Sequence, residues 1–146
     1  MTILSLATAR EIADTAIAYG AEHGIAPLCV AICDAGGNVL QLSRDERASL
    51  YRPEIASAKA KGCLGMGFGG REVARRAAAM PAFYAAVGVA TGGGLVPVAG
   101  GVLIRDNAGV LLGAIGISGD TADNDELCAV RGIEAAGYVA DTGAPE

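Results

Sequence analysis

Two pairs of apolar segments, each joined by a turn of a few residues, constrain the fold of this chain most strongly. Residues 26–34 and 39–44 flank the turn sequence AGGN, and residues 95–106 and 110–119 flank NAG. Glycine and asparagine favour such tight turns. Strands joined by so short a turn pair antiparallel, because parallel neighbours need a crossover of about a dozen residues or more. The two hairpins therefore predict an antiparallel sheet.

Helical periodicity and helix-breaking residues outline the remaining segments. Apolar residues recur at helical spacing in residues 5–23 and 51–65, and residues 123–138 begin with acidic side chains, as many helices do. Residues 71–87 are also helix-like, but Pro81 interrupts them, so we expect a bent or split helix there. The predicted fold is α+β, with an antiparallel sheet of about four to five strands flanked by helices in the order α-β-β-α-α-β-β-α.

Length and composition predict one small domain that associates with copies of itself. The chain has 146 residues, the usual size of a single domain, and shows neither a repeat nor a low-complexity linker, so one domain is expected over residues 1–146. Only the polar end, residues 141–146, is expected to fray. The chain is 52% hydrophobic and 18% charged, which leaves few charges to cover its surface. We therefore predict a homo-oligomer.

Charge and patterning exclude several classes of partner. The net charge is −5, and the lysines are Lys59 and Lys61 alone, whereas nucleic-acid binding relies on clustered lysine and arginine. No apolar run approaches the roughly 18 to 20 residues of a membrane span, and the N-terminal sequence lacks the pattern of a secretion signal. The sequence predicts a cytoplasmic protein that binds neither nucleic acid nor membrane.

The cysteines are expected to be buried free thiols. None of the four forms a C-x-x-C pair, and Cys29 and Cys33 lie in an apolar strand-like run. With a single histidine in the chain, a tetrahedral zinc site is not expected.

Several short motifs, each common by itself, occur together along most of the chain. They are Asp34-Ala35-Gly36-Gly37, Arg44-Asp45-Glu46-Arg47-Ala48, Lys59-Ala60, Gly93-Gly94-Leu95-Val96-Pro97, the strand from Gly113 to Gly119, and Asp125-Glu126. In this combination the chain resembles the GlcG/HbpS family. The resemblance implies an antiparallel sheet flanked by helices and assembly into dimers or larger rings. Members are described as haem-binding or haem-degrading, as domains beside corrinoid adenosyltransferases, or as glycolate-operon proteins.

One motif departs from the family pattern. The family is expected to have Arg-Met-Asp-Gly-Ala where this chain has residues 44–48, so Asp45 and Arg47, in place of the usual Met and Gly, add two charges. Because the resemblance places this segment near the ligand, the departure indicates a divergent ligand.

His23 and Arg44 are candidate ligand-binding residues. His23 is the only histidine, so it is the one imidazole able to ligate haem iron as a metal ligand or to act as a base near neutral pH; alternatively, it caps the first helix. Arg44 ends a predicted strand, and its guanidinium suits a carboxylate or a haem propionate. An ion pair with Asp45 or Glu46 is the simpler explanation.

Gly93, Gly94 and Ser118 complete the candidate ligand contacts. The two glycines allow backbone N–H groups to approach an anion, although a tight connection between elements explains them equally. Ser118 ends a predicted strand beside the acidic start of the last helix.

Lys59, Asp125 and Glu126 are the candidate catalytic residues. Lys59 lies among alanines, so it is expected to be a half-buried cation that holds an anion or acts as a base, or else to extend from a packed face to solvent. Acidic residues at a helix start are common, but Asp125 and Glu126 also suit proton transfer or a divalent ion. We predict that these carboxylates pair with Arg44 or Lys59.

Two main functions remain open at this stage. The first is an oligomeric protein that binds a small molecule with carboxylate groups, haem or a related tetrapyrrole above all, with His23 as axial ligand. The second is a cofactor-independent isomerase, hydratase or hydrolase. In it Arg44 and Lys59 bind the carboxylate of a small organic acid, and Asp125 or Glu126 transfers a proton. A structural accessory subunit is a third.

Overall fold

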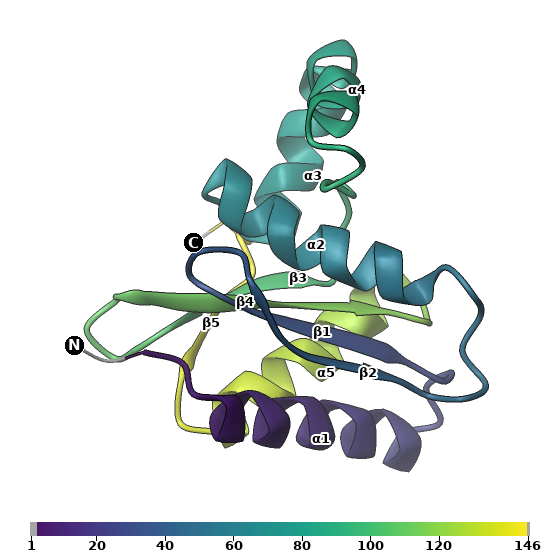
Figure 1. The fold of residues 1–146 in the computed structure, drawn as a ribbon, viewed down its shortest axis with the longest axis vertical. Helices are drawn as coiled ribbons and strands as arrows, with labels where there is room; N and C mark the ends of the chain where they lie inside the picture. Colours follow the sequence, from purple (N-terminus) through teal and green to yellow (C-terminus); the bar gives the residue numbers. More distant parts are fainter. Residues whose placement is uncertain (1–2, 146) are drawn as a thin grey trace.

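The structure is a five-stranded antiparallel sheet between two layers of helices. A computed structural model describes residues 3–145. Its elements are α1 (Leu6–Glu22), β1 (Cys29–Asp34), β2 (Val39–Arg44), α2 (Arg52–Met66), α3 (Gly70–Ala79), α4 (Pro81–Ala90), β3 (Gly101–Arg105), β4 (Leu111–Ser118), α5 (Ala122–Ala135) and β5 (Val139–Asp141). The strand order is β2-β1-β4-β3-β5. The predicted α+β class and both hairpins are confirmed (Figure 1).

Pro81 begins α4 one residue after the end of α3, so the helix-like segment is split, which is one of the two expected forms. The structure differs from the sequence prediction at three points. The predicted element order lacked β5 and counted α3 and α4 as one helix. The predicted strand over residues 95–106 begins only at Gly101, because residues 95–100 form an irregular connection. The expected fraying is wrong for Asp141, which ends β5 opposite Leu103 and pairs with Arg105 at 3.0 Å.

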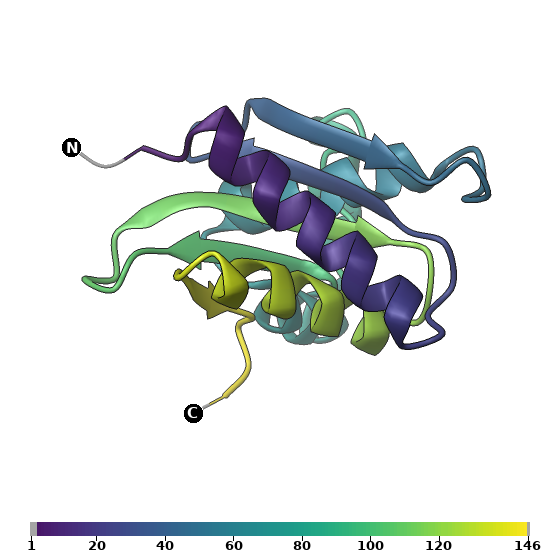
Figure 2. The same cartoon turned by 90° about the horizontal axis from the view of Figure 1, so that it is seen from below.

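The helices cover the sheet unequally. Helices α1 and α5 lie side by side on one face (Figure 2), and the largest apolar cluster, with Ile12, Ile115 and Ile133, lies between them and the sheet. On the other face α2 packs over the central strands, and α3 and α4 extend away from the sheet (Figure 1). None of the helices in residues 3–145 combines the length and apolar character needed to cross a membrane.

Helix α2 lies close to the sheet because most of the residues between them are small. Ala56, Ala60 and Cys63 face β1, β3 and β4, where their neighbours are Ala31 and other small side chains. At Gly116 of β4, a Cβ atom would lie 1.9 Å from the carbonyl oxygen of Ala56. This close approach carries the middle of α2, including Lys59, over the end of β4.

Helix α4 is apolar but mostly exposed. It contains no charged residue, and Tyr84 is its only buried side chain, whereas Phe83 and Val89 are 52% and 83% exposed. Exposed apolar surface of this kind is typical of contacts with another chain. The homo-oligomer predicted from composition stays a prediction.

All four cysteines are free and buried, as predicted. Burial raises the pKa of Cys63 to about 12 and the pKa values of Cys29 and Cys128 to about 11. Because the thiolate is the reactive form, we expect the folded protein to resist Ellman's reagent at about pH 8. Four equivalents should react once guanidinium unfolds the chain. A thiol that reacts in the folded protein as fast as in the unfolded one would contradict this burial.

Candidate functional site

Lys59 and Asp125 form a buried ion pair between α2 and α5. The Lys59 ammonium donates to Asp125 Oδ2 at 3.1 Å and to the carbonyl oxygen of Ile117 at 2.8 Å. The two side chains are only 4% and 2% exposed. The predicted pairing of Lys59 with an acidic residue at the start of the last helix is therefore confirmed, although Lys59 is fully rather than half buried.

The surroundings of this ion pair leave little room for a ligand. Asp125 Oδ1 accepts the backbone N–H of Asp120 at 2.9 Å. Burial raises the pKa of Asp125, and the N–H of Asp120 and the Lys59 ammonium oppose that effect. Gly100 has φ +111°, and a Cβ there would lie 2.8 Å from Lys59 Nζ. The pair thus joins α2, β4 and α5 with its polar atoms already engaged.

Glu126 and Ser118 form separate polar contacts at the same end of the sheet. Arg71 of α3 donates to Glu126 Oε1 at 3.0 Å and to Asp123 Oδ1 at 2.7 Å. Ser118 is fully buried, and its hydroxyl accepts a hydrogen bond from Arg52 Nη1 at 2.9 Å. The predicted partner of Glu126 was Arg44 or Lys59, so this arrangement was missed.

Arg44 stabilises the loop that follows β2. Its Nη1 donates to the carbonyl oxygens of Asp45 and Ala48 at 3.2 and 3.0 Å, while the Asp45 carboxylate pairs with Arg47 instead. The expected simple alternative, an ion pair of Arg44 with Asp45 or Glu46, is replaced by these carbonyl contacts.

The glycine loop after α4 uses its own amides. The N–H of Gly93 donates to the carbonyl oxygen of Gly88 at 2.8 Å, and that of Gly94 to Thr91 Oγ1 at 3.2 Å. These bonds end the helix, so the tight connection describes the two amides better than an anion site. Gly94 also lines a hollow between α2 and α4.

His23 has the predicted helix-cap geometry, and its role as a ligand stays a prediction. It is the C-cap of α1, and its Nδ1 lies 2.8 Å from the carbonyl oxygen of Tyr19. A carbonyl only accepts hydrogen bonds, so Nδ1 carries the proton and the lone pair is on Nε2. The imidazole is exposed and stacks on the Tyr19 ring with centroids 4.0 Å apart. A helix cap of this kind leaves Nε2 able to bind a metal.

Two neighbours of His23 were not among the predicted site residues. Tyr19 precedes it by one helical turn, so helical spacing alone would have revealed that contact. The Arg131 guanidinium lies 5.5 Å from the centre of the Tyr19 ring and comes from α5. No local pattern in the sequence indicates that contact, because it depends on how α1 and α5 pack. Within residues 3–145, no group of three or more His, Cys, Asp or Glu side chains is arranged to hold a metal ion.

A comparison with protein-family models identifies the family of this chain. The family model described as "Haem degrading protein HbpS-like" matches residues 4–134. The chain belongs to this HbpS-like family. The match covers every candidate residue from His23 to Glu126 and confirms the resemblance derived from the motifs. Strand β5 lies beyond it.

Solved structures show the same HbpS-like fold. The PduOC:Heme complex is 26% identical, with a TM-score of 0.82, and the match covers 98% of this chain and 100% of that one. HbpS is 27% identical, with a TM-score of 0.79 and coverage of 92% and 91%. Protein ORFY of Klebsiella pneumoniae, at 22% identity, a TM-score of 0.83 and coverage of 94% and 93%, shares the fold. No curated protein matches the chain.

Proposed function

We propose that this HbpS-like protein binds haem or a closely related tetrapyrrole, with His23 as an iron ligand. The family and the similarity to a haem complex over nearly the whole chain support a haem ligand. The observation that carries the proposal is the hydrogen bond from His23 Nδ1 to Tyr19. Histidines that ligate metals usually donate their other N–H to a carbonyl or carboxylate, which fixes the tautomer and the ring orientation.

The surface around His23 suits the rest of a haem group. The exposed Arg131 offers a guanidinium to a propionate, on the same surface as Tyr19 and His23. Leu127, one helical turn before Arg131, adds partly exposed apolar surface. Bound haem would supply the iron chemistry, while the chain supplies an imidazole, a cation and one apolar side.

A homo-oligomer completes this proposal. His23 is exposed, so one protomer covers only one face of a flat ligand placed on it. Leaving the other apolar face in water is unfavourable, and a second copy of the chain would cover it. The predicted oligomer and the predicted ligand would then stabilise each other.

The experiment is a haemin titration of the wild type and of His23→Ala, followed by the Soret band. We expect a saturable shift in the wild type and an affinity at least about tenfold lower in His23→Ala, since an iron ligand is lost. Glu22→Ala, a change at the neighbouring exposed residue, is the matched control and should bind as the wild type does. Far-ultraviolet circular dichroism shows whether each variant is folded.

The outcomes separate the function from the ligand assignment. Equal affinities of the wild type and His23→Ala would contradict ligation by His23. A wild-type spectrum without a saturable shift would contradict haem binding altogether. The alternative enzyme receives no comparable support, because the ammonium of Lys59 and the carboxylates of Asp125 and Glu126 are engaged with protein partners.

A further inference from the structure

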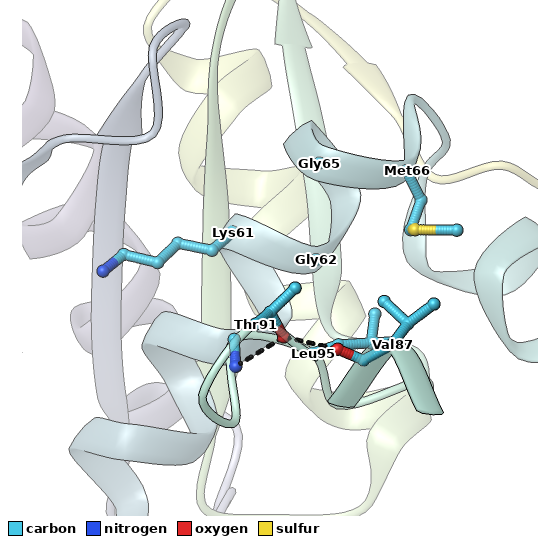
Figure 3. A pocket seen from close by; sticks show the side chains of 8 residues that line it. Lys61, Gly62, Gly65, Met66, Val87, Thr91 and Leu95 are labelled. Carbon is cyan, nitrogen blue, oxygen red and sulfur yellow. Dashed lines mark hydrogen bonds between the residues drawn. The ribbon is translucent and has the colours of Figure 1, made fainter. Parts of the chain in front are cut away.

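A hollow of about 240 Å³ lies between the C-terminal half of α2 and helix α4, on the opposite side of the sheet from α1 (Figures 1 and 3). It is lined by Lys61, Gly62, Gly65, Met66, Val87, Thr91, Gly94 and Leu95. For comparison, an apolar cavity of about 150 Å³ holds a benzene molecule. The space therefore suits a fused two-ring compound or an apolar body of similar size.

Gly65 keeps this hollow open. Glycine in a helix is less favourable than alanine, so a glycine there calls for a local reason. Gly62, one turn earlier, packs against Leu95, whose side chain would have to move to admit a Cβ, because that Cβ would lie 2.7 Å from Leu95 Cδ1. A Cβ on Gly65 would meet no atom within 4 Å. Packing within the chain therefore does not require a glycine at position 65, and a larger side chain there would take up space in the hollow.

The residues that line the hollow favour an apolar ligand with one negative charge. Met66, Val87 and Leu95 are apolar, and the Thr91 hydroxyl is engaged with the Val87 carbonyl oxygen and the Gly94 N–H. Lys61 is the only charged lining residue, and it takes part in none of the salt bridges within residues 3–145. An unpaired cation is a favourable contact for an anion in a chain whose net charge is −5.

The position of Lys61 places that charge at the rim. Lys61 lines the hollow, and in Figure 3 its side chain extends away from Met66 and Val87. Lys61 and Gly65 also line a second hollow of about 350 Å³ beside Gly36 and Gly37 of the β1–β2 turn. A ligand with its rings between α2 and α4 would thus direct its charged group toward Lys61 and solvent.

We propose that the hollow between α2 and α4 binds an aromatic monocarboxylate, with Lys61 contacting the carboxylate and Gly65 leaving space for the rings. This site is separate from the haem surface proposed at His23, since α1 and α2 cover opposite faces of the sheet (Figure 1).

Isothermal titration calorimetry of the full chain with 2-naphthoate tests this site, with 2-naphthalenemethanol as the uncharged comparison. We expect Lys61→Gln to weaken 2-naphthoate binding about fivefold, less at high salt, and to leave the alcohol unaffected. Gly65→Leu fills the hollow and should weaken both compounds at least about tenfold. Gly88→Leu is the matched control, because it also adds a side chain where a Cβ meets no atom within 4 Å, but it lines a different hollow without a charged residue.

Three results would overturn the proposal. They are no measurable binding of 2-naphthoate to the wild type, unchanged binding in Gly65→Leu, or equal losses in Gly65→Leu and Gly88→Leu. An unchanged affinity of Lys61→Gln for 2-naphthoate would contradict the proposed contact between Lys61 and the carboxylate. Should Gly65→Leu fail to fold, Val87→Phe fills the same space from α4. Haemin titration of Gly65→Leu, expected to match the wild type, separates this site from the proposed haem function.

Discussion

Replacing Lys59 with methionine is expected to lower the free energy of unfolding by about 3 to 5 kcal/mol. The change removes the cation that neutralises Asp125 and leaves a carboxylate that is almost fully buried. It also removes the ammonium donor to the Ile117 carbonyl oxygen. Urea denaturation followed by circular dichroism measures the loss, which should appear as a lower midpoint with a similar slope.

Lys61→Met is the matched control for this prediction. It is the same substitution two residues along α2, at a side chain that is exposed and outside the salt bridges of the described residues. Its effect should stay within about 0.5 kcal/mol. Equal losses of unfolding free energy in the two variants would show that the Lys59–Asp125 ion pair contributes no more to stability than an exposed lysine does.

The double variant Lys59→Met with Asp125→Leu tests how much of the lost unfolding free energy comes from leaving one charge buried alone, rather than from losing the ion pair itself. Removing both charges from a buried pair is often close to neutral, so we expect most of the loss to be recovered. Recovery should be incomplete, because the Asp120 N–H loses its acceptor at Asp125 Oδ1. A double variant less stable than Lys59→Met would contradict this account.

Features determined by neighbouring residues were predictable from the sequence. The turns AGGN and NAG define both hairpins, and Pro81 marks the junction of α3 and α4, because turn and proline geometry depend on local backbone angles. The burial of Cys29 and Cys33 likewise follows from their apolar run. These features need no knowledge of how distant segments pack.

Features that depend on distant contacts were not predictable to the same degree. Strand β5 has only three residues, and its place beside β3 is stabilised by the ion pair of Arg105 with Asp141. The partner of Lys59 could be predicted by charge, but its burial depends on how closely α2 approaches β4. At His23 the sequence left a cap and a ligand as alternatives. The contact with the Tyr19 carbonyl oxygen confirms the cap, and the ligand role stays a prediction.

Gly116→Ala is expected to cost more than about 4 kcal/mol, a loss seen only where a substitution breaks a specific structural requirement. The new Cβ would lie 1.9 Å from the carbonyl oxygen of Ala56 and 2.8 Å from the backbone nitrogen of Ala60. Both are backbone atoms of a helix, so no side-chain rotation relieves the overlap and α2 must move as a unit. Thermal unfolding should show a much lower midpoint or no cooperative transition.

Gly65→Ala is the matched control, since it makes the same change on α2 where a Cβ meets no atom within 4 Å. It should stabilise the protein by about 0.5 to 1 kcal/mol, because alanine favours the helix. A Gly116→Ala protein of wild-type stability would contradict the close packing of α2 on β4.

The two destabilising predictions are linked through α2. Moving this helix away from Gly116 would also draw Lys59 from Asp125 and Ile117, because Ala56, Lys59 and Ala60 share one helical turn. The effects of Gly116→Ala and Lys59→Met should therefore be less than additive, as expected for sites coupled by one backbone shift. Additive losses would mean that α2 adjusts locally at Gly116 while the ion pair stays intact. Less than additive losses would show that the small residues between α2 and β4 also position the buried ion pair.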